Sequence, residues 1–296
     1  MEFSRRHVLA GGLSLFAVAA CSPQTVLADP TQPLPPPEER IAALGHQYKA
    51  QIGVYAVDLR PQKSMSYRDN EAFAMCSTFK AYAAGAVLQR SQQGRLALGD
   101  TVPIAADDIL PNSPVTEPRV GTAMTLAELC QAALQQSDNA AANGLLRVLG
   151  GPPAITEFAR SIGDDRTRLD RWEVELNSAV PGDPRDTSTP RALGAGFQNL
   201  LTGSVLDPAG RQQLTDWMLG NQTSSMRAGL PAGYTSADKT GSGDYGTTND
   251  VGVVFGPAEE RVLLAIMTKT ATDDPDAPSL RPLIGELAAL ALAEVN

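Results

Sequence analysis

Histidine is almost absent from this chain, which has only two among its 296 residues, His7 and His46. His7 lies in an N-terminal segment that we predict to be an export signal. A Ser-His-Asp triad would therefore have to use His46, in a predicted helix at residues 38–50. A zinc hydrolase needs several His or Cys ligands. We predict no metal and no cofactor, and a catalytic base that is Lys or Glu.

Cysteine is nearly as scarce, with three residues, of which Cys21 belongs to the N-terminal segment. The other two are Cys76 and Cys130. They can form a disulfide in an oxidising compartment or remain two buried free thiols, because the sequence does not fix the distance between them. Both alternatives stay open at this point.

Positive charge is also in deficit, since 24 Lys and Arg face 33 Asp and Glu and the formal net charge is -9. The basic residues are scattered and form no stripe that would neutralise a phosphate backbone. We therefore exclude nucleic acid as a partner. The acidity indicates a soluble exterior, because net charge bears on solubility and steering before it bears on chemistry.

The N-terminus carries the pattern Ser-Arg-Arg-x-x-Leu at residues 4–9. The apolar run at residues 8–20 is too short to span a bilayer as a folded helix. We predict an export signal at residues 1–28 of the twin-arginine type, with an ordinary secretory signal as the alternative. A lipoprotein box ending at Cys21 would add a lipid anchor, whereas Val26-Leu27-Ala28 offers a cleavage site. The protein is expected to be exported, and to be periplasmic, attached to the cell envelope or secreted.

The rest of the chain has strand patterns at both ends and helical patterns in the middle. Residues 29–37 contain five prolines, which predicts an extended tether. Helical periodicity runs from residue 77 to about residue 220, with start signals at Thr125, Thr189 and Asp207. Strands are predicted at residues 51–58, 236–239, 251–255 and 262–269, and a last helix at residues 279–295.

This order of elements predicts an α/β (α+β) fold. An antiparallel sheet flanked by helices is expected from both chain ends, at residues 38–75 and 225–296. An all-α domain is expected at residues 76–224. The active site is expected in the cleft between the two parts, where ligands commonly bind.

The segment Ser77-Thr-Phe-Lys80 opens a predicted helix, so the ammonium of Lys80 lies one turn from the hydroxyl of Ser77. Serine alone is a poor nucleophile. A neighbouring cation stabilises alkoxide character, a neutral amine accepts the proton, and the helix N-terminus favours negative charge. The four-residue pattern is common by chance, and by itself it indicates no more than a capping serine and a solvated lysine.

Two further motifs follow in the order Ser137-Asp138-Asn139 and Lys239-Thr240-Gly241. With Ser-x-x-Lys they make the signature of class A β-lactamases and penicillin-binding proteins. From about residue 38 to the C-terminus, the chain resembles a class A β-lactamase. The resemblance implies β-lactam substrates and inhibitors as small-molecule partners, and we expect a monomer.

The resemblance also implies a role for each motif residue. Ser77 is the nucleophile, with Lys80 beside it, and Ser137 passes a proton to the departing ring nitrogen. Asn139 orients the side-chain amide of the substrate. Lys239 and the hydroxyls of Thr240 and Ser242, around Gly241, receive the substrate carboxylate. The backbone N–H groups of Ser77 and Ser242 form the oxyanion hole.

The segment Arg171-Trp-Glu173-Val-Glu-Leu-Asn177 separates a hydrolase from a transpeptidase. It resembles the family loop in which Glu173 and Asn177 hold the hydrolytic water, with Arg171 and Asp186 as the ion pair that closes the loop. Without this loop the acyl-enzyme would persist. Other hypotheses are a penicillin-binding DD-peptidase, a serine glutaminase or esterase of the same superfamily, and a β-lactam sensor domain.

Several positions depart from the family pattern. Val174 stands where many relatives have proline after a cis peptide bond, and we predict that Glu173–Val174 is cis. Thr248 stands where relatives supply an arginine for the substrate carboxylate. The segment before Arg227 looks about two residues short, so Arg227 either turns into the cleft or is a surface arginine.

Three further interpretations concern neighbouring positions. Asn112 replaces an aromatic residue, so no aromatic stacking on the substrate is expected there. Trp172 and Trp217 are read as packing residues. The glycines at residues 241–246 match a dinucleotide-loop pattern only in letters, because no βαβ unit surrounds them. The sequence does not distinguish penicillins, cephalosporins and carbapenems as substrates.

Overall fold

The computed structural model describes residues 34–60 and 63–296, and Pro36–Asn296 form one compact unit. The predicted export signal at residues 1–28, with Cys21, lies outside the described residues, as does the predicted tether up to residue 33. Pro37 was expected to end the tether and instead begins helix α1 (Pro37–Tyr48). Proline suits this place because the first N–H groups of a helix have no intrahelical partner.

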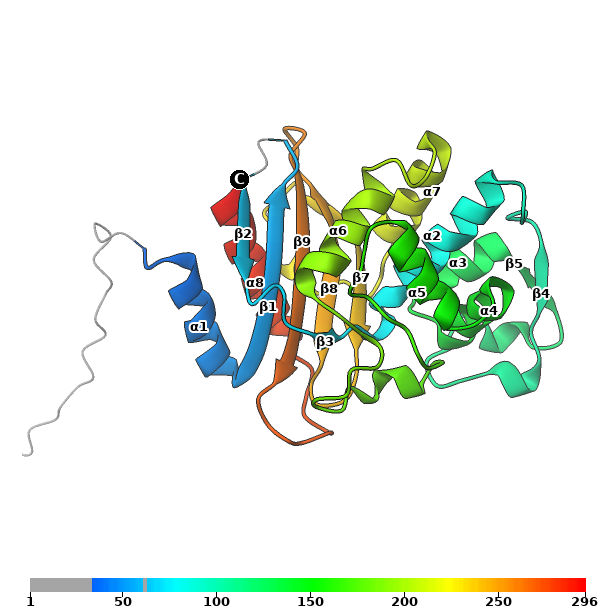
Figure 1. The fold of residues 1–296 in the computed structure, drawn as a ribbon, viewed down its shortest axis with the longest axis horizontal. Helices are drawn as coiled ribbons and strands as arrows, with labels where there is room; N and C mark the ends of the chain where they lie inside the picture. Colours follow the sequence, from blue (N-terminus) through cyan, green and yellow to red (C-terminus); the bar gives the residue numbers. More distant parts are fainter. Residues whose placement is uncertain (1–33, 61–62) are drawn as a thin grey trace, which may run out of the picture. The chain divides into compact units, whose positions relative to one another are not determined.

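In the described part of the chain, five strands form one antiparallel sheet in the order β2-β1-β9-β8-β7 (Figure 1). They are β1 (Ala50–Asp58), β2 (Ser64–Tyr67), β7 (Thr235–Ser242), β8 (Thr248–Phe255) and β9 (Arg261–Thr270). Because β1 pairs with β9 along its whole length, the two ends of the chain meet in the middle of the sheet. The predicted sheet built from both chain ends is confirmed.

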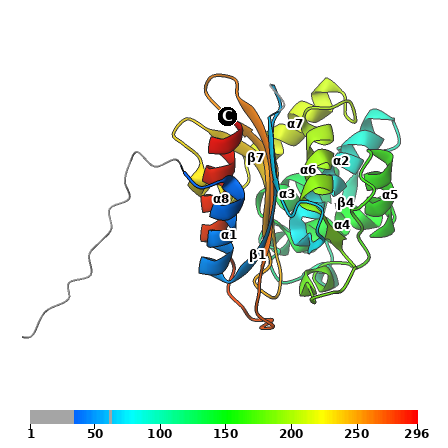
Figure 2. The same cartoon turned by 60° about the vertical axis from the view of Figure 1, so that its left-hand side comes forward.

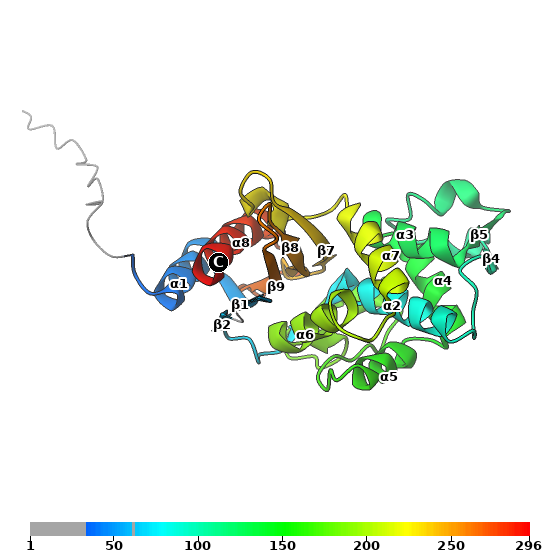
Figure 3. The same cartoon turned by 90° about the horizontal axis from the view of Figure 1, so that it is seen from above.

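The sheet is buried on both faces. Along β9, Leu264 and Ile266 join one hydrophobic cluster, whereas Leu263 and Ala265 join the other. This alternation follows from the two-residue period of a strand, and it explains why β9 reads as a continuous apolar run. Helices α1 and α8 (Arg281–Val295) cover one face, and the remaining helices lie on the other (Figures 2 and 3).

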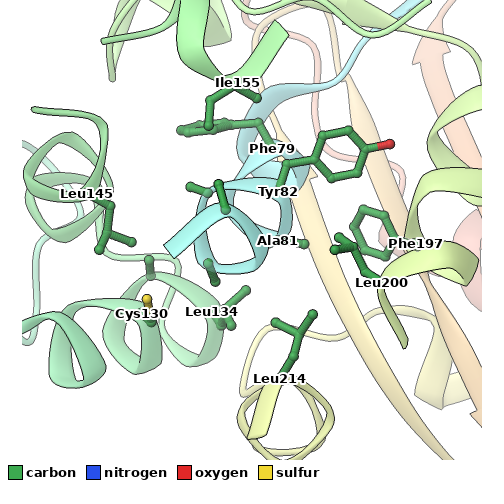
Figure 4. Close-up of a cluster of buried hydrophobic side chains, with 14 of the residues drawn as sticks. Phe79, Ala81, Tyr82, Cys130, Leu134, Leu145, Ile155, Phe197, Leu200 and Leu214 are labelled. Atoms are coloured by element: carbon green, nitrogen blue, oxygen red, sulfur yellow. The ribbon is translucent and has the colours of Figure 1, made fainter. Parts of the chain in front are cut away.

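Helix α2 (Phe79–Gln92) is the buried centre of the helical part. Every residue from Phe79 to Leu88 is buried, and Figure 4 shows Phe79 and Tyr82 surrounded by side chains from neighbouring helices. A helix enclosed on all sides has no polar stripe. Such close packing holds the side chains on the first turn of α2 in fixed positions. The surrounding helices are α3 (Leu126–Gln135), α4 (Asn139–Leu149), α5 (Pro153–Ser161), α6 (Pro190–Leu201) and α7 (Pro208–Leu219).

The middle range is not purely helical, in contrast to the predicted all-α domain at residues 76–224. Strands β4 (Thr101–Pro103) and β5 (Ala123–Thr125) pair with each other, and β6 (Thr187–Ser188) pairs with β3 (Phe73–Ala74). Strands of two or three residues carry too little periodicity to be recognised in a sequence. Short 3₁₀ helices are η1 (Cys76–Thr78), η2 (Ala106–Asp108), η3 (Glu117–Arg119), η4 (Glu175–Ser178) and η5 (Met226–Gly229).

The predicted helix start signals are present. Thr125 accepts the N–H of Glu128, whose carboxylate returns to the Thr125 N–H, which completes a capping box. Thr189 and Asp207 cap α6 and α7 through the N–H groups of Ala192 and Gly210. Each cap supplies an acceptor to an N–H that the helix leaves unpaired.

The two cysteines of this part of the chain, Cys76 and Cys130, are free and fully buried, so buried thiols are the alternative that the structure contains. Burial raises the pKa of both thiols. Trp217 is buried in the core as predicted, whereas Trp172 is 37% exposed. Among the described residues, every helix is too short or too polar to cross a membrane.

Candidate active site

Ser77 lies in η1, directly before α2, and only 7% of its surface is exposed. Its hydroxyl Oγ donates to Oε1 of Glu173 at 3.2 Å. Cys76, the preceding residue, has a positive φ of 48°, an uncommon conformation for a residue with a side chain. The nucleophile predicted from the sequence therefore lies at a tight turn directly before the buried helix α2, in contact with the predicted base.

The ammonium of Lys80 has no exposed surface and is surrounded by acceptors. Its Nζ lies 2.9 Å from Glu173 Oε1 and donates to Asn139 Oδ1 at 2.7 Å and to the Ser137 carbonyl at 2.8 Å. Burial lowers the pKa of Lys80, and the negative charge of Glu173 opposes this effect. The ion pair with Glu173 thus holds the Lys80 ammonium in the water-poor interior beside Ser77.

Glu173 is 3% exposed, and Asn143 of α4 fixes its backbone. Asn143 Nδ2 donates to the Glu173 carbonyl at 2.9 Å, and Asn143 Oδ1 accepts the Glu173 N–H at 3.1 Å. The peptide bond Glu173–Val174 is cis, as predicted. Asn177 Nδ2 donates to Glu173 Oε2 at 2.5 Å, so each carboxylate oxygen has a partner.

The loop that carries Glu173 is closed at its base by the predicted ion pair. Arg171 Nε donates to Asp186 Oδ2 at 2.6 Å. The other oxygen of Asp186 accepts the N–H groups of Asp170 and Arg171 at 2.7 and 3.0 Å. Asp186 is fully buried, and these donors together replace the water that its charge would otherwise need.

Ser137 connects the two buried lysines. Its hydroxyl Oγ lies 3.3 Å from Lys80 Nζ and 3.1 Å from Lys239 Nζ, and its φ is 55°. Burial, and next the positive charge of Lys80, lower the pKa of Lys239 to about 7. Three motifs that are far apart in the sequence therefore converge on one hydroxyl.

Two glycines allow β7 to approach the nucleophile. A Cβ at Gly241 would lie 2.5 Å from the Met75 carbonyl oxygen, and one at Gly243 would lie 2.4 Å from the Asn177 carbonyl oxygen. No side chain fits at either position. The missing side chains bring Ser242 beside Ser77, where both residues line the same cleft. The oxyanion hole formed by the N–H groups of Ser77 and Ser242 stays a prediction.

Known proteins resemble this chain in sequence along most of its length. A family model described as the beta-lactamase enzyme family matches residues 36–295. The carbapenem-hydrolyzing β-lactamase KPC of Klebsiella oxytoca is 44% identical over 93% of this chain and 92% of its own. β-Lactamase CTX-M-8 of Citrobacter amalonaticus is 45% identical over 85% of this chain and 86% of its own.

Solved structures agree with these relatives. The β-lactamase of Burkholderia phymatum is 41% identical with a TM-score of 0.85, covering 88% of this chain and 98% of its own. The class A β-lactamase of the last common ancestor of Gram-negative bacteria is 49% identical with a TM-score of 0.83, covering 87% and 98%. The chain belongs to the class A β-lactamase family. The resemblance inferred from three motifs is confirmed, and the chain is a serine hydrolase.

In this class A enzyme, the cleft at the nucleophile has a volume of about 280 Å³. It is lined by Ser77, Asn112, Gln136, Ser137, Asn139, Asn177, Thr223, Thr240, Ser242 and Arg281. Asn112 lines it at the position where the sequence predicted no aromatic contact. His46 lies in α1 and lines a separate hollow. The described residues contain no group of three or more His, Cys, Asp or Glu that would hold a metal ion.

Arg227 does not line this cleft, so of the two alternatives left by the sequence, a side chain turned into the cleft is not the one found. Its guanidinium donates to the carbonyls of Leu219, Asn221 and Ser236 at 2.9, 2.7 and 2.7 Å, and to Ser236 Oγ at 3.0 Å. These carbonyls lie at the end of α7, after it and in β7, so Arg227 ties the connecting segment to the sheet. The guanidinium N–H groups of Arg227 are therefore occupied by these acceptors.

Arg281, which sequence reasoning missed, lines the cleft instead. It is the first residue of α8, and the preceding N–H of Leu280 donates to Thr248 Oγ1 at 2.8 Å. Thr248 thus anchors the start of α8 beside β8. The one sequence signal for Arg281 was the small residue Thr248, which leaves space for a cation that another segment of the chain contributes. Asn143 was also missed, because no motif marks it.

Proposed function

We propose that this protein hydrolyses the amide bond of penicillins and cephalosporins through an acyl-enzyme on Ser77. The observation that carries the proposal is the position of the Glu173 carboxylate. One of its oxygens contacts both Ser77 Oγ and Lys80 Nζ, and the other contacts Asn177. The same carboxylate can therefore accept a proton first from the nucleophile Ser77 and later from a water molecule.

In the acylation step, Ser77 Oγ attacks the β-lactam carbonyl carbon and loses its proton. The direct contact between Ser77 and Glu173 supports Glu173 as the acceptor, with the Lys80 ammonium stabilising the charge between them. The carbonyl oxygen becomes negative and is held by the N–H groups of Ser77 and Ser242. The ring C–N bond then breaks, and Ser137 delivers its proton to the nitrogen. Ser137 recovers a proton from Lys80 Nζ, 3.3 Å away, and Lys80 takes the proton held by Glu173, so the Glu173 carboxylate is restored before deacylation.

In the deacylation step, Glu173 takes a proton from a water molecule, and the oxygen of that water attacks the ester carbonyl. The bond to Ser77 Oγ breaks, Ser77 recovers a proton, and a ring-opened acid leaves. The amide oxygen of Asn177 is buried without a partner among the described residues, so it is free to accept a hydrogen bond from that water. General-base help of this kind contributes about 10²–10⁴ in rate.

The substrate carboxylate binds at Lys239, Thr240 and Ser242, and Arg281 supplies the additional cation. Arg281 takes this role in place of Arg227, whose donors are occupied by backbone carbonyls. Asn139 receives the side-chain amide of the substrate from the opposite side of the cleft. We also propose that residues 1–28 direct export to the periplasm, the cell envelope or the medium, and that the mature protein is a monomer.

Nitrocefin turnover tests the proposed function. We expect many hydrolysed molecules per enzyme molecule, with none after Ser77→Ala. A single stoichiometric acylation, seen as one mass increment on the intact protein without turnover, would contradict the hydrolase and favour a penicillin-binding DD-peptidase.

A further inference from the structure

Two buried aspartates lie on neighbouring strands, one in the strand that carries Lys239 and one in the strand beside it. Asp238 is in β7 and pairs with Gly252, and Asp250 is in β8 and pairs with Thr240. They are therefore diagonal neighbours on one face of the sheet, and both are fully buried. A Cβ at Gly252 would lie 2.2 Å from the Ala237 carbonyl oxygen and 2.7 Å from the Asp238 Cβ, so only glycine fits opposite Asp238.

The two carboxyls differ in their hydrogen-bond donors, because both oxygens of Asp238 have a donor whereas only one oxygen of Asp250 does. Asp238 Oδ1 accepts Ser236 Oγ and lies 3.4 Å from Arg227, and its Oδ2 accepts Asn221 Nδ2 at 2.7 Å. Asp250 Oδ2 accepts two backbone N–H groups at 2.8 Å, those of residues 225 and 226. Its Oδ1 is buried and finds no donor among the described residues.

The carboxyl that faces Asp250 from the neighbouring strand is that of Asp238, its diagonal neighbour across β7 and β8. Two ionised carboxylates in contact inside a protein repel each other strongly, and one shared proton removes the conflict. The shared proton is therefore expected on Asp250 Oδ1, the oxygen that accepts no hydrogen bond.

We propose that Asp250 is protonated on Oδ1 and donates to Asp238, and that this single-charge pair positions the hydroxyl of Thr240 for the substrate carboxylate. The proposal rests on the proposed function for its effect on substrate. Burial, and next the neighbouring Asp238, raise the pKa of Asp250 well above its usual value. The charged groups that face the pair are Lys239 on β7 and Arg227 in η5, both cationic.

A hydrogen-bond chain leads from the pair to the cleft. Asn221 donates to the carboxylate and to the carbonyl of Asp238, and its Oδ1 accepts both the N–H and the hydroxyl of Thr223 at 2.8 Å. Thr223 Oγ1 lies 2.5 Å from Thr240 Oγ1, and both hydroxyls line the cleft.

The direction of these hydroxyl bonds can reverse. When Thr223 donates to Asn221, Thr240 donates to Thr223. When a substrate carboxylate accepts the Thr240 proton, Thr223 donates to Thr240, and Asn221 still holds the Thr223 N–H. The acid pair is thus a positioning device for carboxylate recognition, and its loss acts on KM more than on kcat.

Asparagine substitutions distinguish the two members of the pair. Asp250→Asn places an N–H donor where the proton is proposed, so we expect KM and the melting temperature to stay close to wild type, with KM within about twofold. Asp238→Asn puts a donor against Asn221, Ser236 or Arg227, and we expect KM for penicillins to rise about tenfold with lower thermal stability.

The matched control is Asp164→Asn, a buried carboxylate outside the cleft. Asp164 Oδ1 accepts the N–H groups of Arg166 and Thr167, and its Oδ2 accepts the Tyr82 hydroxyl at 2.6 Å. We expect Asp164→Asn to lower stability without changing KM. This outcome separates the general cost of replacing a buried aspartate from the effect on the cleft.

Infrared spectroscopy tests the proton directly and without reference to activity. The wild type should show the carbonyl band of a neutral carboxylic acid at neutral pH, and Asp250→Asn should lack it. If the band is missing, or if Asp250→Asn raises KM as much as Asp238→Asn, the proposal is wrong. Wild type that never turns over nitrocefin would instead contradict the proposed function, because the band and the stability difference do not depend on turnover.

Discussion

Lys80 Nζ and Glu173 Oε1 form an ion pair 2.9 Å long in which neither side chain is exposed to solvent. Charges buried in this way need further hydrogen bonds to offset their loss of water. Lys80 obtains them from Ser137 and Asn139, and Glu173 obtains one from Asn177. The ion pair therefore depends on two of the three motifs and on the Glu173 loop, so replacing Glu173 tests several contacts together.

Replacing Glu173 by Gln should stop deacylation. The amide cannot take a proton from water or from Ser77, so we expect kcat for penicillins to fall by about 10²–10⁴. Acyl-enzyme that still forms, with Lys80 as the remaining base beside Ser77, should persist and be visible by intact mass. Glu175→Gln is the control, because Glu175 is exposed two residues away in the same loop. Equal losses in the two variants would mean that Glu173 contributes only negative charge.

Lys239 should make KM depend on pH. Its ammonium is charged below its pKa of about 7 and neutral above it, so attraction for the substrate carboxylate is present at low pH and fades as pH rises through that value. We expect KM to increase by up to about tenfold per pH unit above the pKa. Lys239→Arg keeps its charge throughout, and a slope unchanged in this variant would assign the effect to another group.

Arg281→Ala should raise KM for penicillins by about tenfold, because it removes a cation from the carboxylate end of the cleft. Arg191→Ala is the control, since Arg191 pairs with Asp69 outside the cleft. Michaelis constants that stay the same for Arg281→Ala and Arg191→Ala would exclude Arg281 from substrate binding.

Arg227→Ala should act on stability. The substitution leaves several carbonyls without a donor and Asp238 without its cation, so we expect a loss of about 1–3 kcal/mol in the free energy of unfolding. Denaturant titration measures this loss. An unchanged midpoint of denaturant unfolding together with a raised KM would instead indicate that Arg227 contacts the substrate carboxylate.

Asn143→Ala should loosen the Glu173 loop. Both the N–H and the carbonyl of Glu173 lose their partner, which is expected to cost about 2 kcal/mol of stability and to lower kcat with little change in KM. Steady-state kinetics and hydrogen exchange of the Glu173 amide check the two parts. A normal kcat with a destabilised fold would limit Asn143 to a structural role.

The sequence by itself determined the chemistry and the class of fold. Ser77, Lys80 and Glu173 were predicted from motifs that resemble those of class A β-lactamases, and the scarcity of histidine left Lys and Glu as the expected bases. The sheet from both chain ends followed from strand patterns at 51–58 and 262–269, since a two-residue period is a local property.

Only the tertiary structure decided which arginine faces the cleft, which residue holds Glu173, and that Cys76 and Cys130 stay apart as free thiols. Arg281 reaches the cleft because Thr248, distant in sequence, anchors the start of α8, and Arg227 turns away because carbonyls from α7 and β7 accept its protons. Side-chain direction depends on partners brought together by packing, and no local pattern records those partners.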